Sequence, residues 1–127
     1  MKLISIVIPC YNSQATIRKV VEMVMEEFKK MKQYECEFVL VNDGSPKDDT
    51  YGEIQRLGED YANVKGVNLL RNFGQHNALM AALHYTSGDY ILGMDDDMQT
   101  HPSQISKLIH KMEEGFDLVY GCYPKKK

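Results

Sequence analysis

Short apolar runs alternate with helical periodicities along the whole chain, and this alternation constrains the fold more than any other feature. The first run, residues 3–8, is rich in isoleucine and is closed by Pro9, as in a strand buried on both faces. Further predicted strands cover residues 37–41, 64–70, 90–94 and 116–120, with helices at about 13–31, 48–61, 75–86 and 102–115. The alternation predicts an α/β fold of three α/β/α layers with a doubly wound, mainly parallel sheet.

The chain's 127 residues are enough for one buried core, and we expect residues 1–127 to form a single domain. An apolar content of 43% and a charged content of 26% are ordinary for a globular protein. The net charge of −3 argues against a nucleic-acid partner, and no apolar run approaches the roughly 20 residues of a membrane span. Three cysteines without metal or disulfide spacing favour reduced core thiols in a cytoplasmic protein.

The predicted topology places the candidate site at one edge of the sheet. In an open doubly wound sheet, ligands bind beyond the carboxyl ends of the strands, where the strand order reverses. An order of 3-2-1-4 puts that reversal between the first and fourth strands. The candidate residues lie at or just past the ends of all four strands: Pro9, Tyr11 and Asn12, then Asp43, then Arg71, then the acidic run 95–97.

The acidic run Asp95, Asp96 and Asp97 is followed closely by Gln99. Crowded carboxylates repel one another, and a hard divalent cation with oxygen ligands commonly offsets their charge. Side chains two apart in an extended chain point the same way, so Asp95, Asp97 and Gln99 can present three oxygen donors while Asp96 turns elsewhere. The run therefore predicts a cation site, with a solvated acidic loop as the alternative.

Carboxylates, one arginine and an aromatic ring suit a metal-bridged diphosphate that is attached to a ribose and base. The chain has no GxGxxG after the first strand and no GxxxxGK[ST], so glycine amides do not cradle the phosphates. A cation on Asp97 would meet the diphosphate charge, with Arg71 as a second contact. Asp43 can accept a hydrogen bond from the base or ribose, and Tyr11 can pack against the base.

Four motifs occur in order: IVIPCYN at residues 6–12, VNDGS at 41–45, RNFG at 71–74 and DDDMQ at 95–99. In order and spacing they resemble the family 2 glycosyltransferases of the GT-A fold. Within that family the chain is most similar to the polyprenyl-phosphate sugar transferases, the dolichyl-phosphate mannose synthase type and its bacterial relatives. The resemblance covers essentially the whole chain.

The resemblance implies roles for the residues at the predicted edge. Those that would line or lie near the pocket for the nucleotide are Pro9, Tyr11, Asn12, Asp43 and Arg71. Asp95 and Asp97 would form the Asp-x-Asp pair, with Gln99 as a further ligand of Mg²⁺ or Mn²⁺, and Asp95 and Asp96 would also face the donor. Ser13 and Asn42 depart from residues common in the family, which leaves the identity of the nucleotide open.

The implied reaction is metal-assisted transfer of a sugar, with inversion, from a UDP- or GDP-linked donor to a polyprenyl phosphate. No catalytic base is identifiable, and the resemblance places it beyond Lys127. The chain is thus expected to be the N-terminal, donor-binding part of a longer enzyme that associates peripherally with the cytoplasmic face of a membrane. The alternatives are a non-catalytic nucleotide-sugar-binding module and a family 2 transferase that elongates a glycan.

A response-regulator receiver domain has a similar alternation of strands and helices. It needs an acidic pair after the first strand and an aspartate after the third. Cys10 and Tyr11 follow the first strand here and Arg71 follows the third, which argues against this class.

Overall fold

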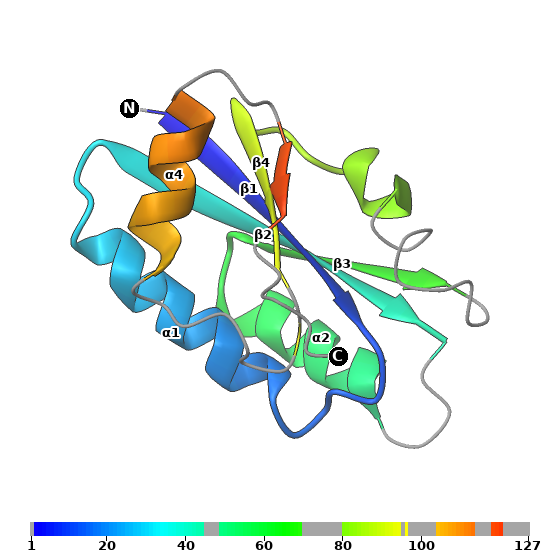
Figure 1. Ribbon diagram of the computed structural model, residues 1–127. Coiled ribbons are helices and arrows are strands. Elements are labelled where there is room, and N and C mark those ends of the chain that lie inside the picture. The colour runs from blue at the N-terminus through cyan, green and yellow to red at the C-terminus, as the bar shows by residue number, and fades with distance from the viewer. Residues whose placement is uncertain are drawn as a thin grey trace, which may run out of the picture.

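The structure is a computed structural model that describes residues 2–44, 49–69, 80–94, 96, 104–113 and 118–120. Its strands are β1 (Lys2–Cys10), β2 (Tyr34–Asp43), β3 (Val64–Leu69), β4 (Tyr90–Gly93) and β5 (Leu118–Tyr120), and its helices are α1 (Ile17–Lys29), α2 (Thr50–Asp60) and α4 (Ile105–Glu113). Residues 80–83 are also helical. The strands form one sheet in the order β3-β2-β1-β4-β5 (Figure 1), and every neighbouring pair is parallel. The predicted parallel α/β fold is confirmed.

The central position of β1 explains its unbroken apolar run. It pairs with β2 on one side, from Lys2 opposite Tyr34 to Cys10 opposite Asn42, and with β4 on the other. Every residue of β1 from position 4 to 10 is buried. A strand that has neighbouring strands on both sides and helices on both faces has no side chain exposed to solvent. Its sequence is therefore continuously apolar and does not alternate between apolar and polar residues.

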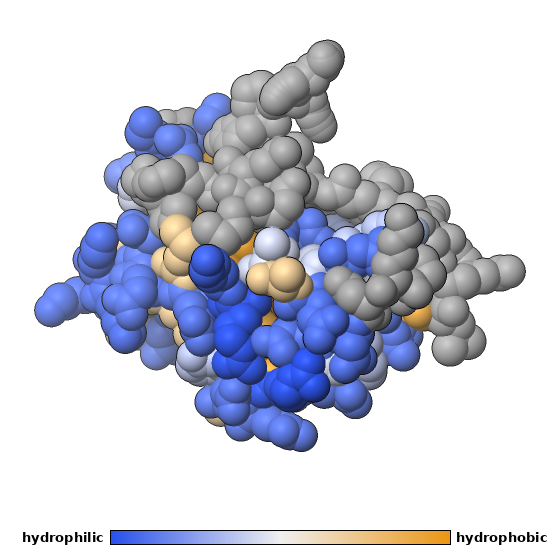
Figure 2. Space-filling model, turned by 90° about the horizontal axis from the view of Figure 1, so that it is seen from below, coloured by the Kyte–Doolittle hydropathy of each residue, from blue (hydrophilic) through white to orange (hydrophobic). Residues whose placement is uncertain are grey.

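Two apolar clusters lie on the two faces of the sheet. The first packs α1, α2 and α4 against β1 and β2, through Ile17, Val20, Val21, Val24, Phe28, Ile54, Leu57, Ile105 and Ile109 on the helices. The second joins Ala82 of the helical segment 80–83 to Val7, Val39 and Val41. The sheet is therefore covered on both faces, as the three-layer prediction requires. Figure 2 shows the underside of Figure 1, where the described residues are mainly hydrophilic with small apolar areas between them.

Helix α1 is shorter at both ends than the predicted helix 13–31. Asn12 has a left-handed backbone (φ 52°), which a continuing helix does not allow. The carbonyl of Ser13 then accepts hydrogen bonds from the N–H groups of Thr16 (3.1 Å) and Ile17 (2.9 Å), and the helix begins at Ile17. The predicted start was wrong because residues 14–16 form a turn, closed by the Thr16 N–H on the Ser13 carbonyl, before the helix begins.

Helix α2 begins at Thr50, with Asp49 as its N-cap. The Asp49 carboxylate accepts a hydrogen bond from the Gly52 N–H at 3.2 Å. This supports the predicted start of the second helix near this aspartate, because an N-cap carboxylate satisfies an N–H group that has no partner within the helix.

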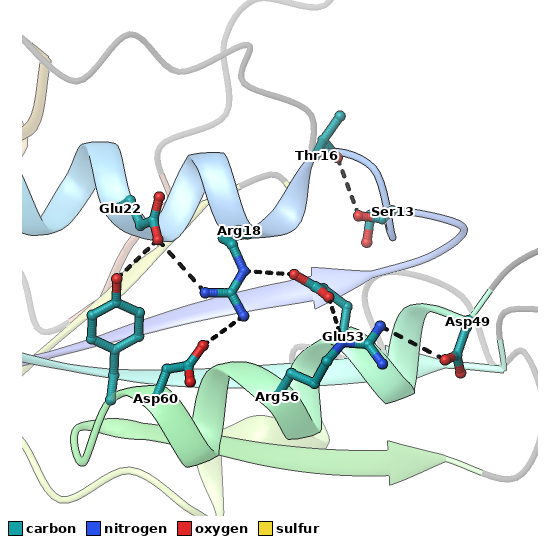
Figure 3. Close-up of polar contacts among 9 residues, drawn as sticks. Ser13, Thr16, Arg18, Glu22, Asp49, Glu53, Arg56 and Asp60 are labelled. Carbon is teal, nitrogen blue, oxygen red and sulfur yellow. Dashed lines mark hydrogen bonds and ion pairs between the residues drawn. The ribbon is translucent and has the colours of Figure 1, made fainter.

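An ionic network joins α1 to α2 (Figure 3). Arg18 donates to Glu53 at 2.7 Å and pairs with Asp60 at 2.9 Å, and Arg56 pairs with the other oxygen of Glu53 at 2.9 Å. Burial raises the pKa of Glu53, but hydrogen bonds from the two arginines outweigh burial, so that its pKa is lowered. The network fixes the two helices whose N-terminal ends lie beside the ends of β1 and β2.

Replacing Arg18 with lysine is expected to lower the free energy of unfolding by about 1 kcal/mol, because one ammonium group cannot reproduce the forked contacts of a guanidinium. Urea unfolding measures the change. As a control, Lys29→Gln removes only the exposed pair with Glu26, and should cost less than about 0.5 kcal/mol. Equal stability of Arg18→Lys and the wild type would show that the network does not hold the helices together.

The amino-terminal half of the sheet contains a buried carboxylate, that of Glu37 on β2. Its Oε2 accepts hydrogen bonds from Ser5 Oγ (2.6 Å) and the Ser87 N–H (2.7 Å), and its Oε1 lies 3.2 Å from Lys65 Nζ. Burial raises the pKa of Glu37, but these three partners outweigh burial and lower it. One carboxylate thus joins β1, β2, β3 and the segment before β4.

Candidate functional site

The loops that follow β1 and β4 lie side by side at the carboxyl edge of the sheet. Val7 of β1 is opposite Gly93 of β4, and the Met94 N–H donates to the Val7 carbonyl at 3.0 Å. Asp96 then reaches the loop after β1, where its Oδ2 accepts a hydrogen bond from the Tyr11 N–H at 2.9 Å. The strand order reverses between β1 and β4, so the structure brings Tyr11 and Asp96 together at the predicted switch point.

A half-exposed tyrosine, Tyr11, directly follows the buried strand β1. Pro9 is buried at the end of the apolar run, whereas Tyr11 is 43% exposed. The left-handed backbone of Asn12 turns the chain directly after this ring. A half-exposed tyrosine at a strand end can stack on a flat ligand while its strand stays packed.

Asp43 is the last residue of β2 and is 3% exposed. The pairing of β1 with β2 ends with Cys10 opposite Asn42. Asp43 is the next residue after Asn42 and Tyr11 is the next residue after Cys10, so the two lie at the same level of the sheet. The adjacent Asn42 donates from Nδ2 to Asn68 Oδ1 of β3 at 2.8 Å. The carboxylate of Asp43 therefore stands on the same edge as Tyr11 and Asp96, held by three paired strands.

Hydrogen bonds also join the N-terminal ends of α1 and α2 beside this edge. The Ser13 N–H donates to Thr50 Oγ1 at 2.9 Å, and the Asp49 N–H donates to Gln14 Oε1 at 2.9 Å. The sequence did not predict Gln14 and Thr50 as part of the site. The only local indication of such contacts is that polar residues occur near the start of each helix. This pattern does not show which residue of the other helix each of them will contact.

Cys10 lies at this edge but is not a nucleophile. Its side chain is fully buried, and its Sγ donates to the Ile8 carbonyl at 3.3 Å. Burial, and to a smaller extent the charge of Asp96, raise the pKa of the Cys10 thiol. A thiol of this kind stays protonated and unreactive. The prediction of a core position is confirmed for Cys10, whereas Cys36 is only half-buried and Cys122 lies outside the described residues.

The predicted metal ligands Asp95, Asp97 and Gln99, and the predicted diphosphate contact Arg71, lie outside the described residues. Within the described part of the chain, no group of three or more His, Cys, Asp or Glu side chains could hold a metal ion. Two carboxylates and an amide oxygen form a hard donor set that fits Mg²⁺ or Mn²⁺. The described neighbours of these ligands, Met94 and Asp96, are bonded to β1 and to the loop after it.

A surface hollow on the outer side of α1 lies away from the carboxyl edge. Its lining includes Lys19, Met25, Lys29 and Tyr61. None of the residues predicted to bind a ligand lines it, so we do not assign the site to this hollow. Among the described helices, none is long and apolar enough to cross a membrane.

Comparison with known proteins identifies the family to which the chain belongs. The sequence profile of "Glycosyl transferase family 2" matches residues 5–127. The chain is 36% identical over 119 residues to an undecaprenyl-phosphate 4-deoxy-4-formamido-L-arabinose transferase of Yersinia pestis (strain Pestoides F), covering 94% of this chain and 36% of that relative. The protein of the same name from Shewanella sediminis (strain HAW-EB3) is 40% identical over 117 residues, covering 91% and 35%.

A solved structure supports the same assignment. The chain is similar to glucosyl-3-phosphoglycerate synthase from Mycobacterium tuberculosis, crystallised with Mn²⁺, UDP and phosphoglyceric acid. The TM-score is 0.62 at 26% identity, over 87% of this chain and 39% of that one. The chain thus spans little more than a third of the length of the relatives that it matches. The chain belongs to glycosyltransferase family 2 and has the GT-A fold that its four motifs predicted.

Proposed function

We propose that this chain binds the nucleotide diphospho-sugar donor of a glycosyltransferase, and that the enzyme transfers the sugar to a polyprenyl phosphate. The observation that carries the proposal is the bond between Tyr11 and Asp96, which joins the loops after β1 and β4 at the switch point with Asp43 level beside them. The Yersinia and Shewanella relatives, named as undecaprenyl-phosphate sugar transferases, support the acceptor class.

On the donor side, the half-exposed Tyr11 ring would stack on the base, and the Asp43 carboxylate would accept a hydrogen bond from the base or ribose. Pro9 and Asn12 would shape the floor and the turn of this pocket. Arg71, which lies outside the described residues, would contact the diphosphate. These roles favour a ligand with both a flat ring and a diphosphate, such as UDP or GDP.

Asp95, Asp97 and Gln99 would hold Mg²⁺ or Mn²⁺ at the end of β4. The ion, when bound, would supply Lewis-acid stabilisation of the departing diphosphate. The Mn²⁺ in the mycobacterial relative supports a divalent ion of this kind. A phosphate acceptor is already ionised and would attack the anomeric carbon with inversion, with less need of a base than a sugar hydroxyl. Because a polyprenyl phosphate is a lipid, we also propose peripheral association of the whole enzyme with the cytoplasmic face of a membrane.

Calorimetric titration of UDP and GDP, each in Mn²⁺ and in EDTA, tests the donor site. We expect one of the two nucleotides to bind, with an affinity at least about 100-fold higher in Mn²⁺, since a bound cation offsets the diphosphate charge. ADP is the matched control, because it carries the same diphosphate on a different base. A folded chain that binds neither UDP nor GDP, or that binds them equally well in EDTA, would contradict the proposal.

A further inference from the structure

We propose that Asp96 is a positioning residue, which fixes the loop after β4 against the loop between β1 and α1 and so holds the two halves of the donor site together. This inference rests on the proposed function of the edge. It gives Asp96 a role that differs from direct contact with the donor, and the two roles can be separated by experiment.

Asp96 contacts the β1–α1 loop at two points through different groups. Its side-chain Oδ2 accepts from the Tyr11 N–H at 2.9 Å, and its main-chain carbonyl accepts from Thr16 Oγ1 at 2.9 Å. The two contacts lie on either side of Asn12, where the backbone is left-handed. We call this pair of hydrogen bonds the Asp96 clamp. A carboxylate that accepts from a backbone N–H forms one of the stronger kinds of hydrogen bond in proteins.

Thr16 gives independent support for the clamp. It is the N-cap of α1, a position where a threonine side chain normally accepts a hydrogen bond from the helix and adds about 1 kcal/mol of stability. No such capping bond is present. The hydroxyl lies 2.9 Å from the Asp96 carbonyl and 3.4 Å from the carbonyl of the local residue Ser13, so its shorter hydrogen bond is the one to Asp96.

The clamp connects the parts that the proposed function assigns to different portions of the donor. Tyr11 carries the ring proposed to stack on the base. Asp96 stands between Asp95 and Asp97, which are proposed to hold the metal at the diphosphate. Its carboxylate therefore ties Tyr11 to the stretch of sequence that carries the proposed metal ligands. A residue that acts in this way needs an oxygen acceptor, but it does not need a negative charge.

The test separates two properties of the Asp96 side chain: its ability to accept a hydrogen bond and its negative charge. Asp96→Asn keeps an oxygen that can accept from Tyr11, whereas Asp96→Ala removes it. We expect the alanine variant to raise the hydrogen-exchange rate of the Tyr11 amide, measured by NMR without ligand, and to weaken the Mn²⁺-dependent affinity for the nucleotide by about tenfold. The asparagine variant should keep both values within about threefold of the wild type.

Two further variants show whether the effect belongs to the clamp. Asp89→Ala is the matched control, since Asp89 Oδ2 accepts from the Leu3 N–H at 2.9 Å near the opposite end of β1. It removes the same kind of bond and should lower stability without changing nucleotide affinity. Thr16→Val removes the second contact of the clamp, and it should weaken nucleotide binding less than additively with Asp96→Ala.

Three results would overturn the inference. Equal loss of affinity in Asp96→Asn and Asp96→Ala would show that the charge of Asp96 acts directly on the donor or metal. An unchanged exchange rate of the Tyr11 amide in Asp96→Ala would show that the clamp does not exist in solution. A wild-type protein that binds no nucleotide would refute the proposed function and with it the role of the clamp in donor binding, whereas the Tyr11 exchange rate would still report the clamp itself.

Discussion

Replacing Glu37 with leucine is expected to lower the free energy of unfolding by about 1–3 kcal/mol. The substitution leaves the buried Ser5 Oγ without its acceptor, whereas the N–H of the exposed Ser87 can turn to water. Lys65 contributes less to the loss, because its side chain is 45% exposed and its charge can return to water. Urea unfolding at neutral pH measures the change.

The exposed Glu35 provides a control on the same strand. Glu35→Leu should change the free energy of unfolding by no more than about 0.5 kcal/mol, as is usual for a surface substitution. Similar losses in Glu35→Leu and Glu37→Leu would show that the effect comes from the new leucine and not from the lost acceptor.

The stability supplied by Glu37 is also expected to depend on pH. Its pKa is lower in the folded protein than in the unfolded chain, so over the range between the two values the unfolded chain binds more protons. The contribution is therefore present above the ordinary pKa of glutamate, and it is lost as the pH falls through the lowered value. The difference in stability between wild type and Glu37→Gln should shrink as the pH is lowered below the ordinary glutamate range. A difference that stays constant over this range would refute the assignment.

Replacing Asp97 with alanine is expected to have the largest effect on ligand binding. In Mn²⁺ the affinity for UDP or GDP should fall by about 100-fold, since loss of a direct ligand should cost at least as much as the 10–100-fold typical of residues that only support one. In EDTA the variant should match the wild type, because Asp97 acts on the nucleotide only through the metal. Calorimetric titration under both conditions gives the two ratios.

Asp43→Asn is the matched variant, because it removes a carboxylate from the same edge that is proposed to contact the base or ribose. It should weaken binding by about tenfold, and by the same factor in Mn²⁺ and in EDTA. The two variants thus predict different patterns for two aspartates of one site. If Asp97→Ala kept the full effect of Mn²⁺, or if Asp43→Asn lost affinity only in Mn²⁺, the division of the site into a base pocket and a metal run would be wrong.

The sequence by itself determined the alternation of strands and helices and the approximate place of each element. Burial on both faces gives β1 and β2 their continuous apolar runs, and the period of 3.6 residues places Ile17, Val20 and Val24 on one side of α1. These are local properties of neighbouring residues, so they can be predicted without the fold. The four motifs added the family, which the comparisons confirmed. The exact start of α1 was missed because nothing in the sequence shows that residues 14–16 form a turn before the helix.

Only the tertiary structure decided which polar groups meet. Asp96 and Tyr11 are 85 residues apart, and Glu37 and Ser87 are 50 apart. Such partners are selected by strand order and register, which bring the ends of β1 and β4 to the same level of the sheet. A hydrogen bond depends on atomic positions to within a few tenths of an ångström, whereas a sequence pattern specifies only a face or an edge. The sequence could therefore place Asp96 near the predicted site. Only the tertiary structure shows that its carboxylate accepts a hydrogen bond from the Tyr11 N–H.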